Sequence, residues 1–179
     1  METRTPLSLI VRALAFAADK HRDQRRKDTQ ASPYINHPID LVNVLCNEAG
    51  ITDETVLCGA ILHDTVEDTE TTLEELEAQF GPTIAGIVEE VTDDQRLTKA
   101  ERKQRQIDRA GGASRAARLV KLADKICNLR DMDSAPPAGW DSPRRREYFD
   151  WAKAVVDQIR GTHPDLEALF DRAYARRPD

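Results

Sequence analysis

The chain has 179 residues, of which 40% are hydrophobic, and this is enough to build the buried core of one domain. Charged residues make up 32%, which excludes a membrane protein, and 26 Lys and Arg against 32 Asp and Glu give a net charge of −6, which argues against general nucleic-acid coating. Aromatic residues make up only 5% and alternating β-branched stretches are few, so a sheet is not expected. We predict one all-α domain over residues 1–179.

The first helix is predicted to begin at Pro6, because proline suits the first helical position. Apolar residues then recur every three to four positions, as on one face of an amphipathic helix. The segment 22–38 is polar and turn-rich and is predicted to be a loop, in which Ser32 and Pro33 restrict the backbone. The residues of the first helix predicted to face the core are Leu7, Ile10, Val11, Leu14 and Ala18.

Two further helices are predicted before residue 65. His37, followed by a proline, opens the first of them, which stops at Gly50, where a left-handed backbone costs little. The next helix follows from about Asp53 and leads directly into His63 and Asp64, after which the helical period is lost. The predicted core positions are Ile39, Val42, Leu45 and Cys46 in the first and Val56, Leu57, Ala60 and Ile61 in the second.

Start and stop signals place the remaining helices. Thr72 with Glu75 three residues later predicts a capping box, in which each side chain accepts a hydrogen bond from a free backbone amide. Gly81 is predicted to end that helix and Pro82 to begin the next. No repeat or linker divides the chain, so a single all-helical domain is the simplest architecture. Later helices are predicted over 99–110, 114–131, 142–161 and from Pro164 onward.

Charge is divided unevenly along the chain. Between Asp28 and Gln95 there is no Lys or Arg, whereas residues 96–130 hold eleven of them against three acids. This division predicts electrostatically opposite faces after folding. The alternative is that these charges serve only solubility, with nothing bound to them.

The three cysteines are predicted to be buried, reduced thiols. Cys46, Cys58 and Cys127 form no CxxC pair and lie within apolar helical patterns. This usage favours a cytoplasmic location. No apolar run approaches the roughly eighteen residues needed to span a bilayer.

A His-Asp pair at the end of an apolar helix is the first candidate site. His63 and Asp64 offer nitrogen and oxygen atoms that can coordinate a divalent metal, although a lone helix-terminal histidine more often contacts the last carbonyls. His37 and Asp124 strengthen the metal interpretation, because Asp124 is an acid in an otherwise apolar stretch and a buried carboxylate needs a partner. Two imidazoles and two carboxylates would leave room for water, as in a catalytic metal site.

Acidic and amide side chains adjoin these residues in the sequence. Glu67 and Asp68 are candidates to align water or to transfer protons, and the alternative is a solvated acidic turn. Asn128 lies four residues after Asp124, so the two share one helix face and Asn128 is a candidate to orient a substrate. An ordinary surface position is its alternative.

Basic and aromatic side chains supply a second group of candidates. Arg26 and Lys27 belong to a basic cluster over 22–27 that suits phosphate contact or stacking on a base, although most such clusters are merely solvated. Tyr148 and Trp151 share a helix face on which core packing is the more common use. The hydroxyl of Tyr148 is a candidate to border a pocket.

Together these residues form an ordered pattern. Its segments are Arg25-Arg26-Lys27, Tyr34-Ile35-Asn36-His37-Pro38, Leu62-His63-Asp64-Thr65-Val66-Glu67-Asp68-Thr69, Val120-Lys121-Leu122-Ala123-Asp124-Lys125, Asn128-Leu129-Arg130 and Glu147-Tyr148-Phe149 with Trp151. The pattern resembles the HD-superfamily metal hydrolases, and within them the alarmone hydrolase domains of RelA/SpoT homologues. The resemblance runs from about residue 7 to about 170 and is greatest to the stand-alone small alarmone hydrolases of the metazoan SpoT homologue type.

The resemblance implies a compact multi-helix HD-domain fold and a hydrolytic activity without a synthetase or regulatory domain. The implied reaction removes pyrophosphate from the ribose 3′ position of ppGpp or pppGpp and yields GDP or GTP. Glu67 and Asp68 would align the water and handle protons. The implied ligands of a manganese ion, or of another divalent metal, are His37, His63, Asp64 and Asp124.

The resemblance also implies how the nucleotide is held. Arg26 would lie against the base and Lys27 would contact the nucleotide, while Asn128 and Tyr148 would hold the ribose or phosphate side. The expected partner is a small nucleotide, with no nucleic acid and no membrane, and the sequence leaves the oligomeric state open.

Two alternatives stand beside this interpretation. The first keeps the metal site and changes the substrate to NADPH, an adenosine alarmone or another nucleotide, because spacing alone does not select guanine over adenine. The second is a non-catalytic helical interaction module. The intact pair Glu67 and Asp68 argues against the second.

Overall fold

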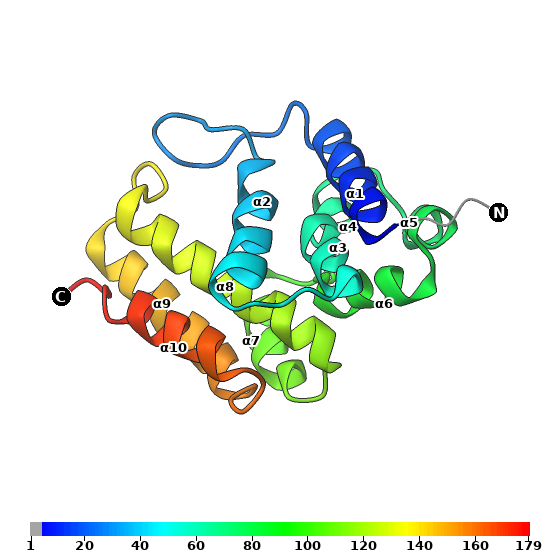
Figure 1. Cartoon of the computed structure of the whole chain (residues 1–179). Helices are drawn as coiled ribbons and strands as arrows, with labels where there is room; N and C mark the ends of the chain where they lie inside the picture. Colours follow the sequence, from blue (N-terminus) through cyan, green and yellow to red (C-terminus); the bar gives the residue numbers. More distant parts are fainter. Residues whose placement is uncertain (1–4) are drawn as a thin grey trace.

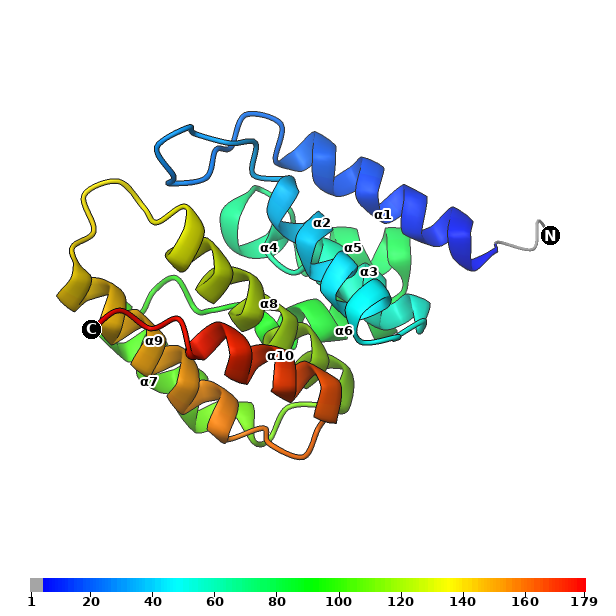
Figure 2. The same ribbon diagram turned by 60° about the vertical axis from the view of Figure 1, so that its left-hand side comes forward.

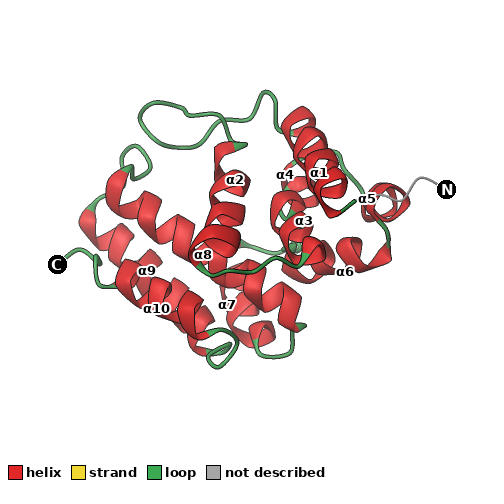
Figure 3. Ribbon diagram, viewed as in Figure 1, coloured by secondary structure: helices red, strands yellow, loops and turns green. Residues whose placement is uncertain are grey.

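The computed structural model describes residues 5–179, and that part of the chain folds into helices with no β-strand, which confirms the all-α prediction (Figure 3). The helices are α1 (Pro6–Lys20), α2 (Asn36–Asn43), the π-helical segment η1 (Val44–Glu48), α3 (Glu54–Leu62), α4 (Thr65–Asp68), α5 (Leu73–Phe80), α6 (Pro82–Val91), α7 (Lys99–Ala110), α8 (Arg115–Ser134), α9 (Ser142–Asp157) and α10 (Pro164–Tyr174).

The helix boundaries follow the local signals of the sequence. Pro6, Pro82 and Pro164 stand at or next to the first helical position, where a missing N–H costs nothing. Gly50 and Gly81 adopt φ values of +69° and +88° after their helices, a conformation that other residues rarely reach.

One predicted cap forms only in part. Thr72 accepts a hydrogen bond from the Glu75 amide, but the Glu75 carboxylate instead binds the ammonium of Lys20 at 2.9 Å. The reciprocal capping box lies at the start of α7, between Thr98 and Glu101. A tertiary ion pair therefore competes successfully with a local cap at α5.

The long helix α8 is the centre of the molecule, and α2, α3, α6, α9 and α10 all pack against it (Figures 1 and 2). Its apolar side chains fill the larger of two core clusters, while the smaller cluster lies between α1, α3, α5 and α6. Buried Leu122, Ala123 and Ile126 surround Asp124 in the sequence, so the tight packing of α8 holds that carboxylate in a defined place.

The inward face predicted for α1 is only partly correct, because Ile10 and Leu14 pack against the core but the other predicted positions are exposed. Leu7 and Val11 are 70% and 53% exposed, whereas Ala13 and Ala17 are fully buried. The reason is that α1 lies at the edge of the molecule and packs mainly on α3, where small side chains allow a close approach (Figure 2). Ile39 is likewise 46% exposed, contrary to prediction.

Several other expectations are corrected in detail. Residues 65–68 form the short helix α4, where a loss of helical period was predicted, and α8 extends to Ser134. The α9 helix ends at Asp157, before Gly161. All three cysteines are free thiols, but Cys46 is only partly buried.

The segment 21–35 crosses over the N-terminal end of α2 and extends toward the loop between α8 and α9 (Figure 1). A backbone hydrogen bond of 3.0 Å from the Ala138 amide to the Lys27 carbonyl joins the two loops. A second bond, from the Arg26 amide to the Ser32 carbonyl, closes the segment on itself. The two loops thus form one rim of the site described below. In the described part of the chain, every helix is too short or too polar to cross a membrane.

Candidate active site

A cleft of about 680 Å³ opens between the 21–35 segment, α2, α4, α8 and the start of α9. All ten site residues predicted from the sequence line it. They come from stretches more than a hundred residues apart, so the fold brings the whole predicted set together. These residues are Arg26, Lys27, His37, His63, Asp64, Glu67, Asp68, Asp124, Asn128 and Tyr148.

Three side chains from three helices converge at the floor of the cleft. His37 lies near the start of α2, His63 caps the C-terminal end of α3, and Asp124 lies in the middle of α8. The distance from Asp124 Oδ1 is 3.2 Å to His37 Nε2 and 3.9 Å to His63 Nε2. One nitrogen or oxygen atom from each lies within 4.8 Å of the others, a spacing that suits shared coordination of one ion.

Asp64 adjoins this group through His63. Its Oδ2 atom is 2.9 Å from His63 Nε2, and the Tyr34 hydroxyl donates a hydrogen bond to the same carboxylate. Tyr34 therefore orients Asp64 from the turn just before α2, and its place in the motif segment Tyr34-Ile35-Asn36-His37-Pro38 is the signal in the sequence that could have identified it.

The hydrogen bonds of His63 determine which of its nitrogens is free. Its Nδ1 lies 2.7 Å from the Ala60 carbonyl oxygen, which can only accept, so Nδ1 carries the hydrogen. Its Nε2 is buried and has no hydrogen-bond partner among the described residues, because the nearby Asp64 oxygen lies off the bonding direction. Nε2 is therefore the ring nitrogen that faces the two carboxylates; it binds a proton when no metal is present, and the residues present fit a divalent cation in place of that proton.

The electrostatics of the group also favour a cation. Burial lowers the pKa of His63, but Asp64 and Asp124 outweigh it and raise that pKa to about 9. Burial raises the pKa of Asp124, yet Lys125 and the two histidines hold it well below its usual value. The pair of carboxylates thus attracts positive charge strongly in a half-buried place, whether that charge is a proton or a metal ion.

Glu67 and Asp68 lie on α4 beside the candidate metal ligands His37, His63 and Asp124. Burial raises the pKa of Glu67 to about 7, aided by Asp64 and opposed by a 2.9 Å hydrogen bond from the Asp93 amide. Asp68 is exposed and accepts a 2.9 Å hydrogen bond from Gln24. Because of these surroundings, Glu67 is a carboxyl that can both accept and release a proton near neutrality.

Asn128 and Lys125 hold the Asp124 carboxylate from its own helix. The Asn128 amide donates to Asp124 Oδ1 at 2.6 Å, and the Lys125 ammonium lies 3.1 Å from Oδ2. Asn128 therefore contacts one of the candidate metal ligands directly. Tyr148, from α9, packs edge-on against Trp140 and lines the same cleft.

Arg26 and Lys27 lie on the rim formed by the 21–35 segment. The Arg26 guanidinium forms a 2.5 Å ion pair with Asp131 and lies over the ring of Tyr34. Lys27 is exposed and keeps its ammonium in solvent at the cleft mouth. The site thus has acids at its floor and cations at its rim.

Sequence reasoning missed several residues that line the cleft. Besides Tyr34, these include Lys121, which lies one helical turn before Asp124, and Gln106, which donates to Asp93. Gln106 acts on the site through Asp93 and then Glu67, and no local pattern reveals such a relay. Lys121 was visible only as a member of the quoted Val-Lys-Leu-Ala-Asp segment.

Comparison with known proteins adds independent findings. The family model described as HD domain matches residues 13–150. The guanosine-3′,5′-bis(diphosphate) 3′-pyrophosphohydrolase MESH1 of Mus musculus is 52% identical, with 94% of each chain covered, and its Drosophila melanogaster counterpart is 51% identical, with 96% of each chain covered. A solved structure of a metazoan orthologue of SpoT, described as hydrolysing ppGpp, superposes with a TM-score of 0.92 at 50% identity, covering 95% of this chain and 96% of that one. The chain therefore belongs to the HD domain family.

Proposed function

We propose that this protein is a manganese-dependent 3′-pyrophosphohydrolase that converts ppGpp or pppGpp to GDP or GTP and pyrophosphate. The observation that carries the proposal is the group His37, His63 and Asp124, which gathers nitrogen and oxygen donors at the floor of a cleft. Its relatives in the mouse and the fly, whose names state this reaction, align with this chain over almost its full length.

In this proposal His37, His63, Asp64 and Asp124 hold the metal. When bound there, manganese supplies a Lewis acid that lowers the pKa of water and offsets charge on a phosphoryl oxygen. The chain prepares the ligands beforehand, because Ala60 fixes the tautomer of His63 and Tyr34 orients Asp64. Asn128 and Lys125 do the same for Asp124.

Glu67 and Asp68 are the proposed catalytic residues. Glu67, with a pKa raised to about 7, accepts a proton from the attacking water. Asp68, held by Gln24, accepts a hydrogen bond that aligns the same water against the 3′-linked phosphorus. The phosphorus–oxygen bond to the ribose then breaks, and a proton is returned to the 3′ oxygen.

The substrate contacts in this proposal come from the rim and from α8 and α9. Arg26 stacks its guanidinium plane on the base, and Lys27 binds phosphate oxygens from the cleft mouth. Asn128 and Tyr148 hold the ribose or phosphate side. A nucleotide with phosphates at both the 3′ and the 5′ position of its ribose matches this cleft. Arg26 and Lys27 lie at its rim, and the candidate metal ligands lie at its floor.

The decisive experiment is product analysis after manganese-loaded protein is incubated in parallel with ppGpp, NADPH and adenosine analogues. We expect release of pyrophosphate from ppGpp and its loss on chelation. Asp124→Ala should reduce turnover by at least about a hundredfold, because one ligand and its oriented charge are removed. Asp133→Ala, on the same helix but outside the cleft, is the matched control.

Two results would contradict the proposal. Wild-type turnover by a folded Asp124→Ala variant would show that the ligand set is wrong. Hydrolysis of an adenosine nucleotide or NADPH in preference to ppGpp would keep the metal site and replace the substrate.

A further inference from the structure

His21 is a buried histidine that the proposed chemistry does not use. It caps the C-terminal end of α1, and only 2% of it is exposed. Among the described residues, its side chain makes one hydrogen bond, in which Nδ1 lies 2.6 Å from the side-chain oxygen of Gln24. The other ring nitrogen, Nε2, is buried and has no hydrogen-bond partner there. An unpartnered buried nitrogen is costly, so packing alone does not account for a histidine at this position.

The contact with Gln24 connects His21 to the cleft. Gln24 donates a 2.9 Å hydrogen bond through Nε2 to Oδ2 of Asp68. Among the described residues, this is the only hydrogen bond that the Asp68 carboxylate accepts, and Asp68 is exposed on the short helix α4. An exposed side chain with a single contact can adopt several rotamers, so the direction of the Asp68 carboxylate depends on Gln24.

Hydrogen-bond chemistry fixes the order of donors from His21 to Asp68. A carboxylate oxygen can only accept, so Gln24 turns its NH2 group toward Asp68 and its carbonyl oxygen toward His21. That oxygen also only accepts, so Nδ1 of His21 carries a hydrogen and donates it. The reversed amide would place NH2 against this N–H and the oxygen against the carboxylate. His21 therefore keeps the Gln24 amide from turning over.

The backbone holds the base of this arrangement in place. The Gln24 amide donates to the His21 carbonyl at 3.0 Å and closes a turn, and the Tyr34 amide donates to the Gln24 carbonyl at 3.1 Å. The His21 ring packs against the ring of Tyr34, with the two centroids 4.8 Å apart. Both the backbone and the ring of His21 are thus fixed independently of the cleft.

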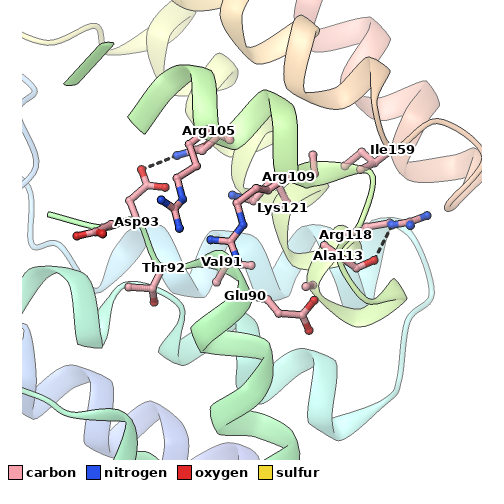
Figure 4. A pocket seen from close by; sticks show the side chains of 14 residues that line it. Glu90, Val91, Thr92, Asp93, Arg105, Arg109, Ala113, Arg118, Lys121 and Ile159 are labelled. Carbon is pink, nitrogen blue, oxygen red and sulfur yellow. Dashed lines mark hydrogen bonds between the residues drawn. The ribbon is translucent and has the colours of Figure 1, made fainter. Parts of the chain in front are cut away.

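Glu67, the other proposed catalytic acid, is held in a separate way. It accepts a hydrogen bond from the Asp93 backbone amide. The Asp93 carboxylate accepts one of 2.7 Å from Gln106, in the wall of a small cavity between α6, α7 and α8 (Figure 4). None of these contacts reaches His21. A change at His21 therefore acts on Asp68 and leaves Glu67 in place.

We infer that His21 is a positioning residue for the reaction, which acts through Gln24 to point the Asp68 carboxylate at the attacking water. The inference rests on the proposed function, in which Asp68 aligns that water. The hydrogen bond from His21 sets the Gln24 amide, and the amide sets the carboxylate. Misplacing a group that aligns water slows the chemical step and leaves substrate affinity nearly unchanged.

Two substitutions of His21 separate the hydrogen bond from the packing. His21→Phe keeps an aromatic ring against Tyr34 but donates nothing to Gln24, whereas His21→Asn is smaller and carries an NH2 group close to the position of Nδ1. We expect His21→Phe to lower kcat at least about tenfold, with KM within about twofold of wild type. His21→Asn packs less well but should keep kcat within about threefold of wild type. A residue needed only for packing would give the opposite order, and that result would overturn the inference.

A substitution of Gln24, which is only partly buried, keeps the test valid where a His21 variant does not fold. Gln24→Glu has the same shape and still accepts from His21, but it places a second carboxylate against Asp68. We expect kcat to fall at least about tenfold. The matched control, Gln30→Glu, makes the same change at an exposed position of the same segment, outside the cleft lining, and should leave kcat unchanged. Wild-type kcat in Gln24→Glu would contradict the inference.

A measurement without turnover tests the hydrogen bond itself. Nitrogen NMR shifts of a histidine ring show which nitrogen carries hydrogen, and the His21 signals are identified by their loss in His21→Phe. We expect hydrogen on Nδ1 of His21, and an Nδ1 without hydrogen would overturn the inference. An absence of ppGpp hydrolysis would contradict the proposed function alone, and the variants would then be compared on the nucleotide that the protein does hydrolyse.

Discussion

One backbone oxygen decides the chemistry of His63. Because the Ala60 carbonyl accepts a hydrogen bond from Nδ1, Nε2 is the nitrogen that faces Asp64 and Asp124 and can bind a proton or a metal ion there. The sequence shows only a histidine at the end of an apolar helix, where contact with a carbonyl or with a metal are alternatives. In the structure, Nδ1 of His63 contacts the carbonyl, and Nε2 remains available to bind a metal ion.

Glu67 illustrates a conflict between stability and function in a single residue. Burial raises its pKa from 4.5 to about 7, so the folded chain holds this proton more tightly than the unfolded chain does. Its contribution to stability is therefore fully present below about pH 4.5 and is lost as the pH rises through 7. At pH 8 the buried carboxylate weakens the fold.

We accordingly expect Glu67→Gln to abolish hydrolysis and yet to raise the melting temperature by a few degrees at pH 8. Glutamine keeps an acceptor for the Asp93 amide and carries no charge to desolvate. Thermal unfolding at pH 8 and pH 5 checks this, and the gain should shrink at the lower pH. Glu77→Gln, at an exposed position of α5, is the control and should change neither property. A lower melting temperature at pH 8 would show that the charge is well solvated.

Helix contacts depend on close approach at a few small residues. A Cβ atom at Gly59 of α3 would lie 2.7 Å from Ile87 Cγ2 of α6, which is closer than carbon atoms can approach. At Gly86 of the same helix α6, an added Cβ would meet nothing within 4 Å.

These surroundings predict opposite effects for one and the same substitution. Gly59→Ala should destabilise the protein by about 1–3 kcal/mol, because overpacking at the α3–α6 contact outweighs the better helix propensity of alanine. Gly86→Ala should be neutral or stabilise by up to about 1 kcal/mol. Urea unfolding measures both free energies. An equal change in unfolding free energy at the two sites would contradict this, because it would mean that α3 and α6 can move apart without cost.

Element ends were more predictable than element faces. The starts at Pro6, Pro82 and Pro164 and the stop at Gly81 depend on the backbone of one or two residues, so they could be predicted from the sequence. The buried face of α1 depends on which helix lies against it. Because α1 packs on α3 through Ala13 and Ala17, Leu7 and Val11 were assigned to the wrong side, whereas Ile10 and Leu14 were assigned correctly.

Across the whole molecule, the candidate metal group ties three helices together. His37, His63 and Asp124 link α2, α3 and α8. The carboxylates of Asp64 and Asp124 repel each other unless a cation lies between them. A divalent ion that binds only the folded chain stabilises it by mass action. Metal binding and overall stability should therefore be coupled.

The expected result is a higher melting temperature when manganese is added to chelator-treated protein, by several degrees at saturation. Asp124→Ala should show little or no such increase, whereas Asp133→Ala should respond as wild type does. Differential scanning calorimetry at several manganese concentrations checks the dependence. An equal increase in the Asp124→Ala variant would place the ion elsewhere.

The helical class, most helix ends and ten of the residues that line the cleft could be inferred from residue order, because caps, glycine and proline act locally and the motif pattern is specific. Contacts between distant segments required the folded chain. Only the folded chain shows that Tyr34 holds Asp64 and that Gln106 reaches Glu67 through Asp93. Such contacts depend on how whole helices are placed against one another, and side-chain spacing along one segment carries no information about that placement.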